Sequence, residues 1–227
     1  MLVQFPSTLR ADITLPTSKS ISARALILRA LAGADTPIHD LSDSDDTRAL
    51  LAALAAATEG NQEEKNRQTP QSEEKVVENN GAKTSSDAND SSTFPIDIGA
   101  AGTAMRFLTA YFATCAGKSC MLTGSARMKE RPIALLVDAL RSLGAEIDYV
   151  EKEGFPPLHI QGKTLRGGTV ELSAQVSSQY ISALLMIAPT LEQGLTLRLL
   201  GEIASAPYIA MTLALMKSFG VDAKWEG

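Results

Sequence analysis

The feature that most constrains the fold is an internal repeat, in which a helix, a strand, a second helix and a pair of strands follow one another three times. The first helices of the copies are predicted over 19–32, 103–116 and 178–189. The strands after them are predicted over 36–41, 119–123 and 195–200, and the second helices over 45–57, 132–143 and 207–219. Further strands are predicted over 146–150, 158–161, 169–172 and 221–225. This order predicts an α/β domain with helices packed on sheets.

Two of the second helices end in similar sequences, which supports the repeat. Ser-Leu-Gly-Ala closes the helix over 132–143, and Ser-Phe-Gly-Val closes the helix over 207–219. Gly144 and Gly220 are the residues expected to cap these helix ends, because glycine adopts the left-handed conformation without a steric penalty.

The segment 59–93 interrupts the first copy. It holds eight acidic and four basic residues, which account for most of the net charge of −5, and almost no large apolar side chain. Such a composition buries too little surface to offset the entropy lost on ordering. We therefore expect a mobile insertion in a surface hairpin, with 94–98 as its returning strand, since hairpin loops tolerate long insertions.

Composition outside this insertion excludes several classes of protein. The remaining charge is nearly balanced and forms no basic patch, so no nucleic-acid partner is expected. The longest apolar run, 181–191, is too short to cross a bilayer, and the sequence lacks the pattern of a secretory signal. Cys115 and Cys120 have neither metal-binding nor redox spacing and are predicted to be buried apolar residues. These features favour a soluble cytoplasmic protein.

The start of the first helix carries groups that suit an anion. Ser18 can cap this helix, while Lys19, Ser20 and Arg24 surround its first turn. Free backbone N–H groups and the positive end of the helix dipole favour an anion there, and an anion would also relieve the conflict between the dipole and two cations. The alternative is an exposed surface pair of cations.

The other two helix starts are also polar or glycine-rich. Gly99 and Gly102 precede the second helix, and Ser177, Ser178 and Gln179 lie at the start of the third. Taken singly, these are equally a tight turn and ordinary helix caps. A threefold repeat, however, would direct all three starts toward one place. The loops 127–132 and 205–208 add further candidates for phosphate or carboxylate contact.

Five sequence blocks in register resemble the N-terminal half of the EPSP synthase family. They are Leu-Pro-Thr-Ser-Lys-Ser-Ile-Ser-Ala-Arg, Ala-Gly-Thr-Ala-Met-Arg, Arg-Met-Lys-Glu-Arg-Pro-Ile, Val-Ser-Ser-Gln-Tyr and Ser-Ala-Pro-Tyr-Ile. The resemblance implies an inside-out α/β barrel domain of the enolpyruvyl transferases, built from three helix–strand–helix–strand–strand repeats. Residues 17–227 would form this domain, and 1–16 would belong to a second domain.

The resemblance also implies a site for each of two substrates. Residues implied to bind shikimate 3-phosphate are Lys19, Ser20, Arg24, Ser177, Ser178, Gln179, Ser205 and Tyr208. Residues implied to contact phosphoenolpyruvate are Lys19, Gly102, Arg127 and Gln179. Lys19 would be the catalytic residue of this half, with the acid and base carboxylates supplied by the other half. Arg106 is implied to be a structural or near-site charge.

The implied reaction joins the two substrates by addition and then elimination. Phosphoenolpyruvate is protonated at its methylene carbon while the shikimate 5-hydroxyl attacks C2, and the adduct then loses phosphate. No cofactor or metal is implied, and the complete enzyme would be monomeric. Glyphosate would occupy the phosphoenolpyruvate position, where a side chain at Gly102 would obstruct it. Thr17, Ala23, Ala100 and Phe107 depart from the residues common in the family.

Two other functions are compatible with parts of this sequence. The sister enzyme that transfers enolpyruvyl to UDP-N-acetylglucosamine shares the fold, but it usually has a reactive cysteine where Ser125 and Ala126 stand here. A non-catalytic phosphate-binding module is the alternative from another class, and it fits a chain that resembles only one half of an enzyme.

Overall fold

The computed structural model describes residues 12, 15–67, 93–203 and 205–226, without the side chains of 59–67. The predictions for most of 1–16 and for 68–92 lie outside the described residues. No helix in the described part of the chain is both long enough and apolar enough to cross a membrane.

The described elements mix helices and strands along the chain. The helices are α1 (Lys19–Leu31), α2 (Asp45–Arg67), α3 (Gly102–Ala113), α4 (Ala126–Lys129), α5 (Ala134–Ser142), α6 (Ser178–Ile187), the 3-10 turn η1 (Ala188–Thr190) and α7 (Ala206–Ser218). The strands are β1 (Thr93–Asp97), β2 (Ser119–Thr123), β3 (Glu146–Tyr149), β4 (Leu158–Gln161), β5 (Gly168–Ser173) and β6 (Leu195–Leu200).

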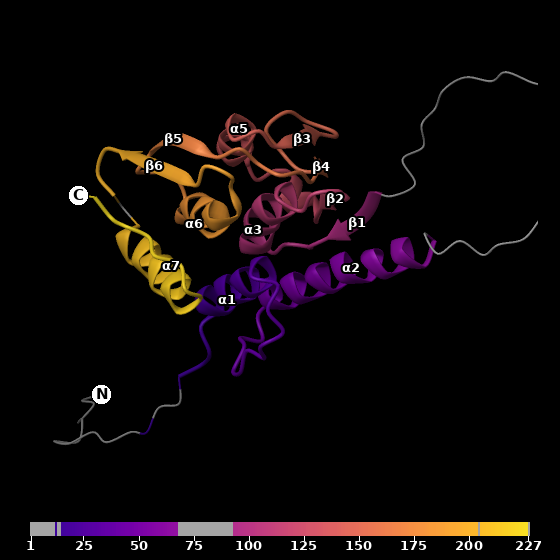
Figure 1. The fold of residues 1–227 in the computed structure, drawn as a ribbon, viewed down its shortest axis with the longest axis horizontal. Coiled ribbons are helices and arrows are strands. Elements are labelled where there is room, and N and C mark those ends of the chain that lie inside the picture. Colours follow the sequence, from indigo (N-terminus) through magenta and orange to yellow (C-terminus); the bar gives the residue numbers. More distant parts are fainter. Residues whose placement is uncertain (1–11, 13–14, 68–92, 204, 227) are drawn as a thin grey trace, which may run out of the picture.

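The strands form two separate sheets (Figure 1). In the larger sheet, of order β1-β2-β4-β3, β1 and β2 run parallel while β4 is antiparallel to both of its neighbours. In the smaller sheet β5 and β6 run parallel. Helix α3 connects β1 to β2 in the same way that α6 connects β5 to β6, so the second and third copies share one strand–helix–parallel-strand unit.

The helices that begin the copies form the centre of the molecule. Helices α1, α3 and α6 pack against one another, and every residue of α3 except Tyr111 is buried. A helix that is apolar on all sides belongs in a core. The strands β5 and β6 alternate between buried or half-buried and exposed residues, so each has one face toward the helices and one outward. Figure 1 shows α3 and α6 between the sheets and α1. The helices-inside arrangement predicted from the resemblance is thus observed.

Both predicted glycine caps are confirmed. Gly144 and Gly220 have φ of 102° and 83°, in the left-handed region. At each helix end the glycine N–H and the following N–H both bond back to carbonyls of the last turn, which is the Schellman arrangement. The second helices of the two copies therefore end in the same way.

Three predictions in the first and last copies are wrong. Residues 36–41 form no strand, because Pro37 lacks a backbone donor and Asp40 takes φ of 55°. Residues 221–225 form no ladder with any described strand. Helix α2 continues to Arg67 through residues assigned to the insertion, where a first hairpin strand was expected. Glu, Gln, Lys and Arg favour helix even where no core is available, and this propensity extends α2 beyond its predicted end.

Candidate functional site

The three central helices begin at one cavity of about 270 Å³, which we call the helix-start cavity. It is lined by Lys19, Ser20, Arg24, Thr103, Ser177, Ser178, Gln179 and Tyr208. The first three residues come from α1, Thr103 from α3, and the next three from the N-cap and first turn of α6. The convergence expected from the repeat is therefore present. Of the residues predicted for shikimate 3-phosphate, only Ser205 is not among the lining residues; it is the N-cap of α7, three residues before Tyr208.

Arg24 is a buried cation at the wall of this cavity. Only 2% of the residue is exposed, and its guanidinium donates to Thr212 Oγ1 and Ser182 Oγ, both at 2.7 Å, and to the Ser20 carbonyl at 2.9 Å. These partners are all neutral, and no carboxylate within the described part of the chain forms an ion pair with Arg24. Burial lowers the pKa of Arg24 to about 10, although the Tyr208 hydroxyl acts in the opposite direction. An anion in the cavity would neutralise this charge.

Lys19 is tied to the start of α3 through Asp46, a residue that the sequence analysis did not select. The Lys19 ammonium lies 3.0 Å from Asp46 Oδ2, while Asp46 Oδ1 accepts from the N–H groups of Thr103 at 2.7 Å and Ala104 at 3.2 Å. Burial opposes ionisation of Asp46, but the hydrogen bonds from Lys19 and the two amides outweigh it and hold its pKa below the ordinary value. Asp46 thus caps α3 and orients Lys19.

We expect Asp46→Asn to destabilise the fold by about 1–3 kcal/mol, because the amide cannot pair with Lys19 and caps α3 less well. The depressed pKa means that the carboxylate stabilises the fold above its unfolded pKa and ceases to do so as pH falls through the lower folded value. The difference between the two proteins, measured by urea unfolding, should be constant above about pH 5 and shrink below about pH 4.

Asp43→Asn is the matched control for this prediction. Asp43 also pairs with a cation, Arg48, but its side chain is 90% exposed against 10% for Asp46. Exposed pairs add little to stability, so this variant should unfold like the parent chain. Equal effects of the two substitutions at neutral pH would show that Asp46 is only another surface carboxylate.

Cap bonds and cross-helix bonds coexist at the α6 start. Ser177 Oγ accepts from the Gln179 N–H at 3.3 Å, so the capping alternative holds for Ser177. The Gln179 side chain reaches across to Thr103 Oγ1 at 3.1 Å and joins α6 to α3. Capping and lining the cavity are therefore not exclusive roles. Thr103 was missed as a lining residue because nothing in the sequence pairs it with Gln179.

A second cavity of about 480 Å³ lies beside the first residues of α3, and we call it the arginine cavity. It is lined by Ala100, Arg127, Met128 and Arg131. Arg127 and Arg131 are exposed and form no ion pair with any described residue. The four residues predicted for phosphoenolpyruvate are therefore divided: Arg127 lines this cavity, Lys19 and Gln179 line the helix-start cavity, and Gly102 begins α3 between Ala100 and Thr103.

Arg106 holds the loop of the arginine cavity in place. Its guanidinium donates to the Gly102 carbonyl at 3.2 Å and to the Pro132 carbonyl at 3.0 Å. The Tyr180 hydroxyl donates to the same Pro132 carbonyl at 2.7 Å. Arg106 is 4% exposed and lines neither cavity, which agrees with the structural role expected for it.

The two cysteines lie away from both sets of lining residues. Cys120 is buried and Cys115 half-buried, as residues of β2 and of the turn after α3. Burial raises the pKa of both thiols, to about 12 for Cys120, which leaves them protonated at neutral pH. The prediction of small apolar residues is confirmed for Cys120 and holds in part for Cys115.

Fold and site together define a mixed α/β protein with two adjoining cationic cavities at the N-termini of its central helices. The chain belongs to the EPSP synthase (3-phosphoshikimate 1-carboxyvinyltransferase) family, whose model matches residues 3–227. A protein of Bacteroides fragilis named 3-phosphoshikimate 1-carboxyvinyltransferase is 50% identical over 224 residues, which are 99% of this chain and 46% of that protein. One of Yersinia pseudotuberculosis with the same name is 45% identical over 94% of this chain and 47% of its own length.

Solved structures of EPSP synthase from Acinetobacter baumannii have the same fold. One superposes with a TM-score of 0.69 at 22% identity, over 95% of this chain and 45% of that chain. A second gives a TM-score of 0.70 at 23% identity over the same shares. The chain thus spans about half the length of the curated relatives and solved structures that it matches.

Proposed function

We propose that this chain forms one half of the active site of a 3-phosphoshikimate 1-carboxyvinyltransferase, which transfers the enolpyruvyl group of phosphoenolpyruvate to the 5-hydroxyl of shikimate 3-phosphate. The relatives described above carry this name. The observation that carries the proposal is the buried Arg24, a cation without an acidic partner in the described residues, at the wall of a cavity where three helices begin. Such a site suits an anionic ligand.

Shikimate 3-phosphate fits the chemistry of the helix-start cavity. Its carboxylate can pair with Arg24, and its phosphate can accept from Ser177, Ser178 and the free N–H groups of α6. Tyr208 offers an aromatic face 5.9 Å from the Arg24 guanidinium, at which the ring of the substrate can pack. Ser205 would reach the phosphate only from the edge of this cavity.

Phosphoenolpyruvate would bind toward the arginine cavity, with Lys19 and Gln179 between the two substrates. Lys19 is held by Asp46 and remains about half exposed, so its ammonium can stabilise negative charge that develops on either substrate. Holding two dense anions side by side requires cations on both, and this arrangement removes the repulsion that would separate them in water. The reaction then needs no group other than acids and bases: a proton to the methylene carbon, a proton from the hydroxyl, and departure of phosphate. The cytoplasmic location and the monomeric state of the complete enzyme stay predictions.

Titration calorimetry of this chain with shikimate 3-phosphate tests the proposal. A site open to water on one side should bind in the high micromolar to millimolar range, or roughly −4 to −6 kcal/mol. We expect Lys19→Met to weaken binding about tenfold or more, as for the loss of one charge-assisted contact.

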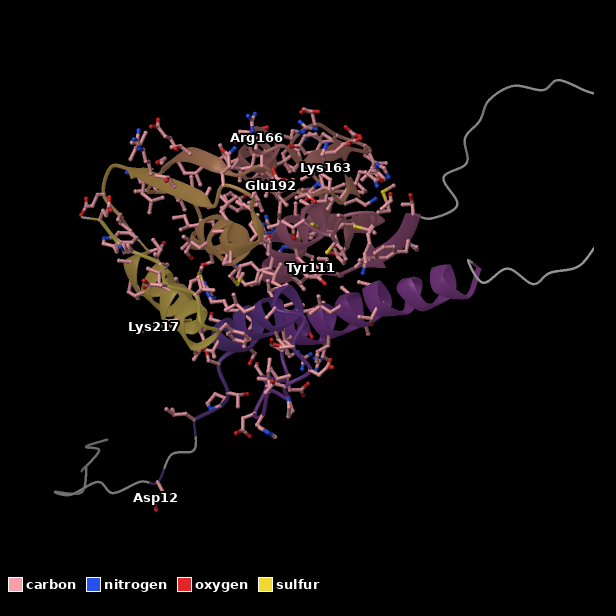
Figure 2. The ribbon with its side chains drawn as sticks, in the orientation of Figure 1. Asp12, Tyr111, Lys163, Arg166, Glu192 and Lys217 are labelled. Atoms are coloured by element: carbon pink, nitrogen blue, oxygen red, sulfur yellow. The ribbon has the colours of Figure 1, made fainter. Side chains whose placement is uncertain are left out.

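Lys163→Met is the matched control, because the Lys163 side chain is 48% exposed, against 49% for Lys19, and also pairs with a carboxylate. Lys163 lies on the opposite side of the molecule from α1 (Figure 2). Binding of UDP-N-acetylglucosamine in preference to shikimate 3-phosphate would favour the sister enzyme, and equal binding of any phosphate would favour a general phosphate-binding module. Either result would overturn the proposal.

A further inference from the structure

Two buried hydroxyl groups hold the guanidinium of Arg24 along one edge. Thr212 Oγ1 accepts from Arg24 Nε, and Ser182 Oγ accepts from Arg24 Nη2, both at 2.7 Å. Both hydroxyl residues are fully buried, and they come from different helices, α7 and α6. Helix α1, which carries Arg24, packs against both of these helices. The direction in which Arg24 presents its charge therefore depends on the junction of three helices.

The partners of the two hydroxyls fix where each hydroxyl proton points. Thr212 Oγ1 lies 2.8 Å from the Tyr208 carbonyl, which can only accept, so the Thr212 proton is donated there. Ser182 Oγ lies 2.9 Å from Thr212 Oγ1, and because the Thr212 proton is already used, Ser182 is the donor in this bond. Both oxygens are thus left to accept from Arg24. The bonds run in one direction, from the guanidinium through the two hydroxyls to the carbonyl.

These bonds also determine what Arg24 has left for a ligand. A guanidinium has five N–H groups. One is donated to Thr212, one to Ser182 and one, from Nη1, to the Ser20 carbonyl. The two that remain, one on each terminal nitrogen, have no acceptor among the described residues, and Arg24 lines the helix-start cavity. A carboxylate can accept from both terminal nitrogens at once, because its two oxygens match the spacing of the guanidinium fork.

The other contacts of Arg24 do not fix its direction in the same way. The Phe107 ring centroid lies 5.4 Å from Arg24 Cζ and attracts the cation, but the face of a ring does not select one N–H group. The Ser20 carbonyl lies one turn earlier on α1 itself, so this bond persists if Arg24 and its helix shift together. Only the hydroxyls of α6 and α7, among these contacts, relate Arg24 to helices that line the opposite parts of the cavity.

We propose that Ser182 and Thr212 are positioning residues of the helix-start cavity, which direct the two remaining N–H groups of Arg24 toward the carboxylate of a ligand whose phosphate binds at the start of α6. This inference rests on the proposed function and deepens it. Neither hydroxyl lines the cavity, so both act through Arg24. Ser182 lies one helical turn after Ser178, or about 6 Å along the axis of α6. Helix α6 therefore sets the spacing between the carboxylate and the phosphate that the cavity accepts.

Thr212→Val tests the inference, because valine has nearly the shape of threonine but cannot accept from Arg24. The parent chain and the variant are titrated by NMR with shikimate 3-phosphate and, separately, with inorganic phosphate, which has no carboxylate. We expect Thr212→Val to bind shikimate 3-phosphate about tenfold more weakly, as for the loss of a well-directed charge-assisted contact, and to bind inorganic phosphate like the parent chain. Thr212→Ser keeps the hydroxyl and should restore the affinity of the parent chain for shikimate 3-phosphate.

Thr109→Val is the matched control. Thr109 is also fully buried, and its Oγ1 donates to the Met105 carbonyl at 2.7 Å, as Thr212 Oγ1 donates to a carbonyl one turn earlier at 2.8 Å. It lies on α3 and makes no hydrogen bond to Arg24, so this variant should bind both ligands like the parent chain. Ser182→Ala removes the other hydroxyl, and it should give the same selective loss even if Thr212→Val does not fold.

Three results would overturn the inference: unchanged binding of shikimate 3-phosphate in both hydroxyl variants, an equal loss for the two ligands, or the same loss in Thr109→Val. If the parent chain binds shikimate 3-phosphate while one of these results is obtained, the proposed function stands and only the role of the two hydroxyls fails. If the parent chain does not bind shikimate 3-phosphate, the proposed function fails and the inference fails with it.

Discussion

The purified chain should show no measurable turnover of shikimate 3-phosphate and phosphoenolpyruvate, and it should gain activity when joined to the remaining half of the Bacteroides fragilis relative. No carboxylate lines either cavity within the described part of the chain. The nearby Asp46 is already bound to Lys19 and two amides, and its lowered pKa makes it a weak base. Proton transfer by a positioned group contributes about 10²–10⁴-fold, and exclusion of water strengthens each charge contact further. We therefore expect the fusion to exceed the isolated chain by about 10⁴-fold or more.

Release of inorganic phosphate, with both substrates present, is the measurement. The same fusion carrying Lys19→Met is the control, since its loss of activity would show that the reaction uses the cavity of this chain and not a site within the added half. Turnover by the isolated chain would mean that an acid–base group was overlooked among these residues. An inactive but folded fusion that binds both substrates would argue against the proposed reaction.

The arrangement of the three helix starts was predictable because it follows from the repeat. Equivalent helices in equivalent units must begin at equivalent places, so Lys19, Thr103 and Ser178 meet although they are far apart in the chain. The bounds of β2, β4 and β6 were also predicted to the residue. The repeat therefore allows three helix starts, each a weak signal alone, to predict one shared site.

Asp46 shows what local patterns cannot reveal. Asp45 and Asp46 stand together in the first turn of α2, and acidic residues at a helix N-terminus are ordinarily explained by the dipole of that same helix. The Asp46 side chain instead caps a different helix, 57 residues further along the chain at Thr103. Only the packing of α2 against α3 brings them together, and no spacing rule encodes that contact.

The approach of the Arg131 guanidinium to the α-carbon of Gly102 was hidden for a similar reason. The Arg-rich loop and the glycine-rich helix start were each recognised as candidates for anion contact, but the sequence does not say which arginine approaches which glycine. The bonds of Arg106 to Gly102 and Pro132 fold the loop back over α3, and this selects Arg131. Likewise, Pro37 and Asp40 break a strand that the repeat predicts, because the first copy departs from its sister copies at this loop.

Arg24→Met should abolish ligand binding while leaving the stability of the fold unchanged or higher. The guanidinium is buried beside neutral partners, and Ser182 and Thr212 remain bonded to each other at 2.9 Å when it is removed. Methionine fills most of the volume, so no large cavity is left. Ser182 and Thr212 still have each other as hydrogen-bond partners. Replacing a buried charge by an apolar group of similar size is often neutral or stabilising. We therefore expect Arg24→Met to unfold at the same or a higher urea concentration than the parent chain.

The same substitution should abolish measurable binding of shikimate 3-phosphate. Removing a buried cation that pairs with a carboxylate lowers affinity more than removing an exposed one, and we expect a loss of about 100-fold or more. Arg29→Met, near the C-terminal end of α1, is the control and should change neither property. Arg24→Ala should lose binding too, but it should also unfold about 2–4 kcal/mol more easily because it leaves a void against Phe107.

The lowered pKa of Arg24 gives an independent check on this cost. Because the folded pKa of about 10 lies below the ordinary arginine value, the unfolded chain binds the proton more tightly, and the penalty of burying the charge is present at neutral pH. The penalty is relieved only as pH rises above about 10, so the parent chain should approach the stability of Arg24→Met there. A parent chain that is more stable than Arg24→Met at pH 7 without ligand would show that Arg24 stabilises the fold. Its burial would then no longer support anion binding in the cavity.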